Sequence, residues 1–319
     1  MENLKKRIAE KIKASRRIAI SSHIRPDADS IGSGLALSLM IQQLGKEAVF
    51  CNTDRAPYPI TRLPHYESIR LRQIYPEAFD TLILIEGGTA ERTGQEHISH
   101  YFSINIDHHA TSPREADLNW VVPEASAVGE MIYELGIELG IEFERDIAFN
   151  LYAAIVSDTG SFKYSNTTFR ALRTASELVK KGDFAPVDVI NLLFNSNPPE
   201  KIRMMTQVLS TLTLAFGNRV GMIDFKRSFL QTLQLKDIET EDIIAIARSI
   251  NGIQVLLFFK EIEDDYYRVS IRSRDDFSAQ QIAQAFKGGG HNHAAGFFYR
   301  GNLETAQKEI LELVHQQLK

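Results

Sequence analysis

Side chains that commonly bind metal ions or transfer protons occur in four short segments of this chain. They are His23, Asp27 and Asp29, then Glu86, then Asp107, His108 and His109, and finally Asp158. Carboxylates gathered at one place repel one another unless protons or cations neutralise them. Imidazole and carboxylate ligands without cysteine suit Mn²⁺ or Mg²⁺ better than structural Zn²⁺. If the fold brings these segments together, the sequence predicts a site for divalent cations.

The charges of this set fit a pair of ions. Two divalent cations would neutralise the four carboxylates Asp27, Asp29, Glu86 and Asp158. Two ions roughly 3.5–4 Å apart can hold the attacking and leaving oxygens of a phosphoester displacement and lower the pKa of a water between them. The first segment alone does not decide the matter, because a polar loop whose Asp29 or Ser30 caps the next helix would contain the same residues.

Regular elements must position these segments. Apolar runs predict strands at 16–22, 47–52, 79–85 and 101–106, and helical spacing predicts helices at 1–15, 30–44, 126–140, 145–156, 168–181 and 184–195. This alternation indicates an α/β fold with a parallel sheet covered by helices on both faces. Open sheets of this kind bind ligands at the carboxyl ends of their strands, where His23, Glu86 and Asp107 stand.

The pattern changes near residue 212. Strands are predicted within 212–225 and 252–273, surrounded by helices at 227–234, 240–250, 278–286 and 303–318. We therefore expect a metal-binding domain over 1–195, a helical linker over 196–212 and a smaller α+β domain over 213–319.

A second motif, Lys-Gly-Gly-Gly-His over residues 287–291, lies in the smaller domain. Glycines allow positive φ, and with it a backbone whose N–H groups approach an anion. A glycine-rich run by itself is usually a flexible turn, so the motif alone predicts only a candidate anion-binding loop. In such a loop His291 would offer a further donor at the same place.

The composition limits the kinds of partner. The 319 residues are 44% hydrophobic, which suffices for two packed cores. The formal net charge is −5, whereas proteins that grip long nucleic acids by their phosphates are usually basic, so short substrates fit better. The single cysteine, Cys51, excludes an internal disulfide and suits a cytoplasmic location. The N-terminal segment lacks the apolar core of a signal peptide, and we expect no membrane span.

The motifs H-I-R-P-D-A-D, D-H-H and S-D-T-G, with a strand-end acid among them, resemble the DHH phosphoesterase superfamily over nearly the whole chain. G-G-G-H-x-x-A-A-G resembles the substrate-binding motif of the DHHA1 domain. The resemblance implies a catalytic DHH domain, a DHHA1 domain across a cleft, and two Mn²⁺ ions, with Mg²⁺ as the alternative. The first ion would lie on His23 and Asp27, and the second on Asp29, His108 and Asp158.

The resemblance also implies roles for the other candidates. Glu86 stands where the family usually has a bridging aspartate, a departure of one methylene that the two following glycines could accommodate. His109 is implied to face the scissile phosphate as a donor, with Asp107 orienting a histidine. Arg92 could pair with Asp107 or with phosphate, and an ordinary surface arginine is the equal alternative. In the DHHA1 domain, the residues implied to hold a nucleotide are Arg272, Ser273, Gly289, Gly290 and His291.

The two-domain layout and the G-G-G-H motif are most similar to the nano-RNase/pAp-phosphatase branch of the family. This implies a Mn²⁺-dependent hydrolase that cuts oligoribonucleotides of a few residues to mononucleotides, or converts 3′-phosphoadenosine 5′-phosphate (pAp) to AMP. Two alternatives stay open: a phosphodiesterase of dinucleotides such as pApA, pGpG or c-di-AMP, and a nucleotide sensor whose catalysis Glu86 has blunted. The expected partners are short single-stranded RNA or small nucleotides. A homodimer is expected only because it is the commonest assembly.

Overall fold

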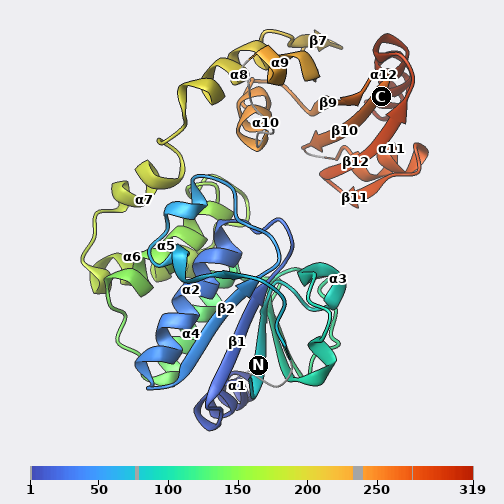
Figure 1. Ribbon diagram of the computed structural model, residues 1–319. Coiled ribbons are helices and arrows are strands. Elements are labelled where there is room, and N and C mark those ends of the chain that lie inside the picture. Colours follow the sequence, from blue (N-terminus) through green and yellow to red (C-terminus); the bar gives the residue numbers. More distant parts are fainter. Residues whose placement is uncertain (1, 76–78, 233–239, 275, 319) are drawn as a thin grey trace. The chain divides into compact units, whose positions relative to one another are not determined.

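The computed structural model describes residues 2–75, 79–232, 240–274 and 276–318 of the chain (Figure 1). The chain divides into two compact units, Met1–Ser196 and Asn197–Lys319. Each unit has its own sheet, its own helices and its own hydrophobic core, so each is described by itself.

The first unit is built on six strands in the order β3-β2-β1-β4-β5-β6, and every neighbouring pair is parallel. The predicted parallel sheet is thereby confirmed. The order reverses between β1 and β4, so the connections that follow these two strands lead away in opposite directions. Open α/β sheets bind their ligands in the crevice at such a point. The strands are β1 (Arg17–Ser22), β2 (Glu47–Asn52), β3 (Arg70–Leu71), β4 (Thr81–Ile85), β5 (Phe102–Asp107) and β6 (Leu118–Val121).

The larger core of this unit lies on one face of the sheet. Alternate strand residues point to opposite faces, so Ile18 and Ile83 pack under the long helices while Ala19 and Leu82 face the other way. The second face is covered by short helices and connecting segments around Ile74. The helices of the unit are α1 (Glu2–Ala14), α2 (Ala28–Gln43), α3 (Ala90–Thr93), α4 (Val128–Leu139), α5 (Arg145–Asp158), α6 (Phe169–Gly182) and α7 (Pro186–Leu193), with 3-10 turns at Ile60–Arg62, Tyr66–Ser68 and Ile98–His100.

The second unit has a six-stranded sheet in the order β11-β12-β10-β9-β8-β7. Its pairs are antiparallel except β8 with β9, which makes the predicted α+β domain a mixed sheet with helices. The strands are β7 (Thr213–Ala215), β8 (Val220–Phe225), β9 (Val255–Glu263), β10 (Tyr266–Ser273), β11 (Gly289–His291) and β12 (Ala294–Arg300). The helices are α8 (Pro199–Leu209), α9 (Arg227–Thr232), α10 (Glu241–Arg248), α11 (Ala279–Ala285) and α12 (Leu303–Gln317).

Helix α8 lies in the region that the sequence suggested as a linker. Its residues Met204 and Val208 are buried with Ile223 of β8 and Ile243 of α10, so the helix contributes to the core of the second unit. The helix predicted at 227–234 is present as α9 up to Thr232, and its last two positions lie outside the described residues.

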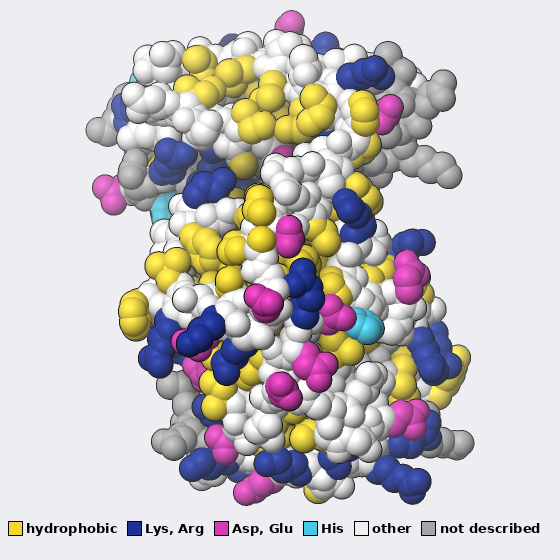
Figure 2. Space-filling view, turned by 90° about the vertical axis from the view of Figure 1, so that its left-hand side faces the viewer, with side chains coloured by type: hydrophobic (Ala, Val, Ile, Leu, Met, Phe, Trp, Pro, Cys, Tyr) yellow, Lys and Arg dark blue, Asp and Glu magenta, His cyan; other side chains and the backbone are white. Residues whose placement is uncertain are grey.

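The surface gives no sign of a broad basic region on the side of the first unit that Figure 2 draws, where acidic and basic side chains are interspersed. This agrees with the net charge of −5. None of the helices within the described ranges has both the length and the apolar character needed to cross a bilayer.

Candidate metal centre

The segment after β1 places the first two metal-type residues. Asp27 is the N-cap of α2: its Oδ1 accepts a hydrogen bond from the Ser30 backbone N–H at 2.9 Å, while the Asp27 N–H donates to Ser30 Oγ at 3.2 Å. This reciprocal cap holds the Asp27 side chain at the start of the helix. Its other oxygen, Oδ2, lies 3.7 Å from Nε2 of His23. The cap of α2 is therefore Asp27 and not Asp29 or Ser30, the two residues expected from the sequence, and Asp27 keeps one oxygen for the centre.

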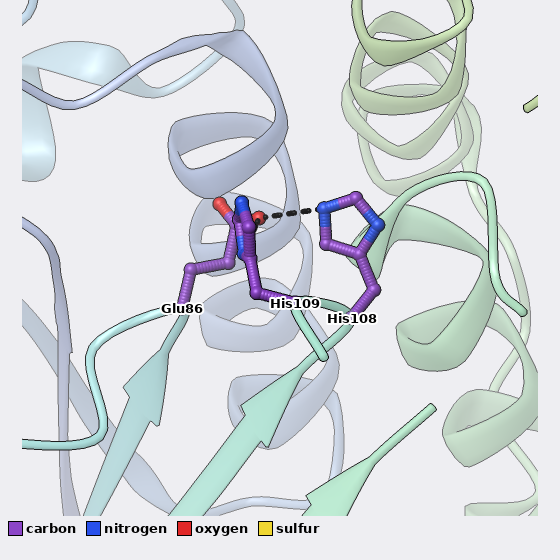
Figure 3. Close-up of side chains that lie close together, drawn as sticks. All are labelled: Glu86, His108 and His109. Carbon is purple, nitrogen blue, oxygen red and sulfur yellow. Dashed lines mark ion pairs between the residues drawn. The ribbon is translucent and has the colours of Figure 1, made fainter. Parts of the chain in front are cut away.

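Glu86 directly follows β4 and lies between two histidines. Glu86 is 1% exposed, and its backbone has a φ of 54°, a left-handed conformation that is uncommon for a residue other than glycine. Oε1 lies 3.1 Å from His108 Nε2, and Figure 3 draws this ion pair as a dashed line. Oε2 lies 3.6 Å from His23 Nε2. Oε2 accepts no hydrogen bond from any described residue. The carboxylate thus directs one oxygen toward each histidine.

Asp29 lies in the first turn of α2 and is buried beneath the start of α4. Its Oδ2 accepts the N–H of Val128 at 2.6 Å, and its Oδ1 accepts the N–H of Gly129 at 3.0 Å and the Ser33 hydroxyl at 2.9 Å. The free N–H groups and the dipole of a helix N-terminus favour a carboxylate at this position. These hydrogen bonds fix the Asp29 carboxylate close to the charges of Glu86 and Asp158.

The histidines are oriented by main-chain carbonyls. His23 Nδ1 lies 2.8 Å from the oxygen of Ile24, and His108 Nδ1 lies 3.1 Å from that of Ala125. A carbonyl oxygen only accepts hydrogen bonds, so each Nδ1 carries a proton and each Nε2 faces the carboxylates. This arrangement is usual for histidine ligands of metals, because the second nitrogen fixes the ring.

The site contains two sets of three side chains whose potential ligand atoms lie within 4.8 Å of one another. His23, Asp27 and Glu86 form one set, and Asp29, His108 and Asp158 form the other. His108 connects them, since its Nε2 lies 3.1 Å from Glu86 Oε1 and 3.4 Å from Asp158 Oδ2. A further set contains Glu86, His108 and His109. The structure thus gathers all six residues predicted as metal ligands.

The pKa values of the histidines reflect these neighbours. Burial lowers the pKa of a histidine, but the carboxylates of Asp27 and Glu86 beside Nε2 of His23 outweigh burial and raise its pKa to about 10. The pKa of His108 also rises to about 10, because its hydrogen bond with Glu86 and the nearby acidic charges outweigh its burial. Both side chains therefore act as strong proton acceptors within this acidic site.

The carboxylates differ according to the partner that each one has. Burial and the charge of Glu86 raise the pKa of Asp158 to about 7, despite the opposing effect of His108. Burial and the charges of Glu86 and Asp158 raise that of Asp29. For Asp27, the hydrogen bond and charge of His23 overcome burial and lower the pKa to about 2. Like-charge repulsion is therefore only partly relieved by the protein's own groups.

The donor set fits divalent cations. It has imidazole nitrogens and carboxylate oxygens, as suits Mn²⁺ or Mg²⁺. Glu86 Oε2 is buried and accepts no hydrogen bond from the described part of the chain, which is costly unless a positive partner binds it. The chemistry of the donors and this orphaned oxygen both match a cation site.

His109 is placed differently from the six candidate ligands. Asp107, at the end of β5, accepts both the His109 N–H at 2.9 Å and its ring Nδ1–H at 2.8 Å through Oδ1. Burial acts to raise the pKa of Asp107, but these hydrogen bonds and the charge of His109 lower it. The His109 side chain is 37% exposed, so its ring is held by one nitrogen while the ring remains accessible. Asp107 thus orients His109.

Arg92 lies on α3, close in sequence to the Glu86 loop. Its carbonyl accepts the N–H of Ile24 at 2.7 Å and so anchors the segment that carries His23. Its side chain is partly exposed. The structure therefore places a backbone contact of Arg92 at the centre's edge and leaves the predicted contact of its side chain as a hypothesis.

The glycine motif forms an edge strand rather than the expected loop. Gly289 and Gly290 in β11 pair with Gly296 and Ala295 of β12. Of the three glycines only Gly290 has positive φ, at 137°, and Gly288 instead allows close contact with Gly296 O and Phe297. The glycines are thus required mainly for close strand pairing. The side chain of His291 lies outside the described residues.

Arg272 and Ser273, at the end of β10, differ in their exposure. Ser273 is 2% exposed, and its hydroxyl donates to the Phe277 carbonyl at 2.8 Å. Its N–H also donates to the carbonyl of His293 at 3.0 Å. Ser273 therefore holds the segment after β11 rather than offering its hydroxyl to a ligand. Arg272 is partly exposed on the opposite side of the strand.

Sequence reasoning missed several residues that shape the centre. Asn166 donates to the carbonyls of Ser126 and Asp158 and so joins the two segments behind His108 and Asp158. Gly32 lies so close to Asn150 O that an added Cβ would stand 2.5 Å from it, which brings α2 against α5. The small residues in the sequence of α2 could have predicted close helix packing, whereas no sequence pattern around Asn166 predicts its two hydrogen bonds.

Three kinds of comparison relate the chain to known proteins. Residues 17–155 match the family model described as the DHH family, N-terminal domain, and residues 229–319 match that of the DHHA1 domain. The chain is 35% identical over 315 residues to the bifunctional oligoribonuclease and PAP phosphatase NrnA of Thermus thermophilus, covering 98% of this chain and 93% of that protein. It is 30% identical to the Bacillus subtilis protein of the same name, over 88% of each chain. In fold, it is similar to an exopolyphosphatase-related protein from Bacteroides fragilis, with a TM-score of 0.89 at 24% identity over 98% of this chain and 95% of that one.

Proposed function

The chain belongs to the DHH family, and we propose that it is a metal-dependent phosphoesterase of very short oligoribonucleotides and of pAp. The names of the relatives from Thermus thermophilus and Bacillus subtilis support this choice, since both are oligoribonucleases and PAP phosphatases. The net charge of −5 supports short substrates over long nucleic acids.

One observation carries the proposal: the buried Glu86 carboxylate faces His23 with one oxygen and His108 with the other. We propose two Mn²⁺ ions, one held by His23 and Asp27, the other by Asp29, His108 and Asp158, with Glu86 shared. When bound, such ions polarise a phosphoryl oxygen and make water acidic enough to act as a nucleophile near neutral pH.

The protein's own groups would contribute positioning and proton handling. Asp107 fixes the Nδ1–H of His109 and stabilises positive charge on the ring. The other ring nitrogen of His109, Nε2, can then hold a proton and donate it to a phosphoryl oxygen or to the leaving oxygen as negative charge develops there. In the second unit, Arg272 and the N–H groups of the edge strand β11 stay candidates for the phosphate and sugar of a nucleotide.

A product assay tests this function. Ribonucleotides of two to five residues, pAp and pyrophosphate would be incubated side by side with Mn²⁺ or with EDTA, and their products separated. We expect mononucleotides from the oligomers and AMP from pAp with Mn²⁺, and none with EDTA. Tight nucleotide binding without turnover of any substrate would instead support a sensor and overturn the proposal.

A further inference from the structure

One face of the sheet in the second unit is covered over only part of its width. Helices α11 and α12 pack on the face that contains Val269, Ile271 and Phe297. On the opposite face, α8 and α10 pack over β8 and β9 through residues such as Ile223 and Phe258. The side chains of β10 and β12 on this second face belong to neither core. We call this part, formed by residues 266–272 of β10 and 294–300 of β12, the open sheet face.

The strand register arranges the open sheet face in four rows. Side chains alternate between the two faces of a strand, so every second residue shares this one. The exposed residues include Arg268 and Phe298, whereas the intervening Val269 and Phe297 are buried. The rows are Tyr266 beside Arg300, Arg268 beside Phe298, Ser270 beside Gly296, and Arg272 beside Ala294.

The third row is a shallow floor of small residues. Ser270 pairs with Gly296, and Gly296 pairs in turn with Gly289 of the edge strand. An added Cβ at Gly289 would have no atom within 4 Å, so space is open above it. Phe298 stands in the row on one side of this floor, and Arg272 in the row on the other. A flat group placed on the floor would have an aromatic side chain at one edge and a guanidinium at the other.

The aromatic edge is held by contacts between its own side chains. The ring of Phe298 lies 5.6 Å from that of Tyr266 at an interplanar angle of 20°, and the Arg300 guanidinium lies 4.7 Å from the Tyr266 ring. Phe298 nevertheless remains 58% exposed. A large apolar ring that is held in place and still solvent-accessible is the kind of surface on which nucleobases stack.

The same face is basic within an acidic protein. Arg268 lies between Phe298 on β12 and Lys260 on β9, and Arg272 and Arg300 share its face. Within the described part of the chain, Arg268 forms no ion pair. Cations interleaved with aromatic rings on an open sheet suit a single-stranded nucleic acid, because phosphates and bases alternate along it in the same way.

We propose that the open sheet face binds the nucleotide next to the one held by Arg272 and the edge strand, with its base against Phe298 and its phosphate near Arg268. This subsite rests on the proposed function and deepens it, because it would let the protein distinguish oligoribonucleotides from mononucleotides such as pAp.

Binding measurements on the full chain in EDTA separate this subsite from catalysis. A fluorescent pentaribonucleotide would be titrated against the wild type, Phe298→Leu and Arg268→Gln, and pAp against the same proteins by calorimetry. Phe298→Leu removes the ring and keeps an apolar strand residue, and we expect it to weaken pentamer binding roughly tenfold, the effect of losing one stacked base. Arg268→Gln should reduce the slope of log affinity against log salt concentration by about one.

Lys308→Gln is the matched control, because it removes one positive charge from α12, which covers the other face. We expect it to leave pentamer affinity unchanged, and all three variants to keep wild-type pAp affinity and thermal midpoint. Wild-type pentamer binding by both Phe298→Leu and Arg268→Gln, or an equal loss of pAp binding, would overturn the subsite. Pentamer binding that depends on Phe298 in a protein that hydrolyses no nucleotide would keep the subsite and overturn the proposed function.

Discussion

At the scale of single residues, Glu86 is the side chain on which the two ligand sets meet. Replacing it by glutamine keeps its size and removes its charge. Changing a group that merely supports a metal ligand usually costs 10–100-fold in metal affinity or activity, so losing a shared ligand should cost more than about 100-fold in Mn²⁺-dependent kcat/KM. Metal titrations of activity would measure the loss. Near-wild-type turnover by Glu86→Gln would contradict its role.

Asp107 allows a test of positioning as distinct from metal binding. In Asp107→Asn the amide can no longer act as a charged acceptor for both N–H groups of His109. Loss of such an orienting carboxylate disturbs the histidine tautomer, and we expect kcat to fall by about 100-fold or more. Metal affinity, measured by calorimetry, should change far less. A variant that loses Mn²⁺ binding and turnover in parallel would show that Asp107 supports the metal site instead.

The raised pKa values predict how stability depends on pH without metal. Asp158 has a pKa of about 7 in the folded chain, so its contribution to stability is fully present below about pH 4, the pKa of an unfolded aspartate, and is lost as the pH rises to 7. His23 and His108, with pKa values of about 10, contribute stability below about pH 6.5 that is lost toward pH 10.

Thermal unfolding in EDTA between pH 5 and 9 should therefore show a falling midpoint, and Mn²⁺ should reverse most of the loss at the alkaline end. Binding of Mn²⁺ should also release protons, which calorimetry in buffers of different ionisation enthalpy detects. The midpoint of a His23→Gln, His108→Gln double variant should depend less on pH above 6.5. An equal slope in wild type and variant would exclude these histidines as the cause.

The types of the candidate ligands could be read from the sequence, since acids and imidazoles stand at the ends of predicted strands. Their orientation could not. The acceptors that fix His23 and His108 are backbone oxygens, which have no residue type to recognise. Ser273 was predicted to contact substrate, but its burial depends on the fold of the segment near Phe277.

At the scale of elements, strand β11 converts the glycine motif into a sheet edge. An added Cβ at Gly290 would stand 2.5 Å from Ala294 O, on a backbone whose φ is 137°, whereas Gly289 has open space. Gly290→Ala should therefore lower the free energy of unfolding by about 1–3 kcal/mol. Gly289→Ala, its matched control, should change it by less than about 0.5 kcal/mol. Urea denaturation would measure both, and equal losses would argue against a specific clash at Gly290.

Helix and strand types were largely predictable because their apolar periodicity is long and regular, as in β4 and α4. The short strand β11 was not, because Gly289 and Gly290 have low intrinsic strand preference and form a strand only through pairing with β12. Likewise, the sequence of α8 shows that the helix has an apolar face, but only the structure shows that this face, with Met204, packs in the core of the second unit.

At the scale of the whole molecule, the net charge of −5, together with the interspersed charges on the face drawn in Figure 2, predicts a preference for short substrates. Binding of long RNA depends on many phosphate contacts, which an acidic protein disfavours. We expect hydrolysis of a 20-nucleotide RNA to be slower than that of a trinucleotide by roughly tenfold or more. Rates with each RNA at equal concentrations of ends would measure this. Equal rates would show that the protein binds long RNA as well as short RNA, and would contradict the prediction from the net charge.

The two-part organisation was predictable from the change in pattern near residue 212, where parallel-sheet alternation gives way to hairpin-like strands. The order of the strands was not, because an alternating pattern is compatible with several arrangements of the same strands. That order, with β1 beside β4, is what brings the loop of His23 next to Glu86.

Because His23 and His108 are oriented by the main-chain carbonyls of Ile24 and Ala125, mutation affects these two contacts differently from a contact made by a side chain. Every amino acid carries the same main-chain oxygen, so no codon change at position 24 or 125 deletes either acceptor outright. The ring tautomers are instead vulnerable to changes that shift the path of the chain, such as loss of the Asn166 amide that ties down Ser126. Substitution of Ile24, which is 37% exposed, should therefore leave the His23 tautomer intact, whereas Ala125 is buried in the core and is constrained by packing and not by its carbonyl.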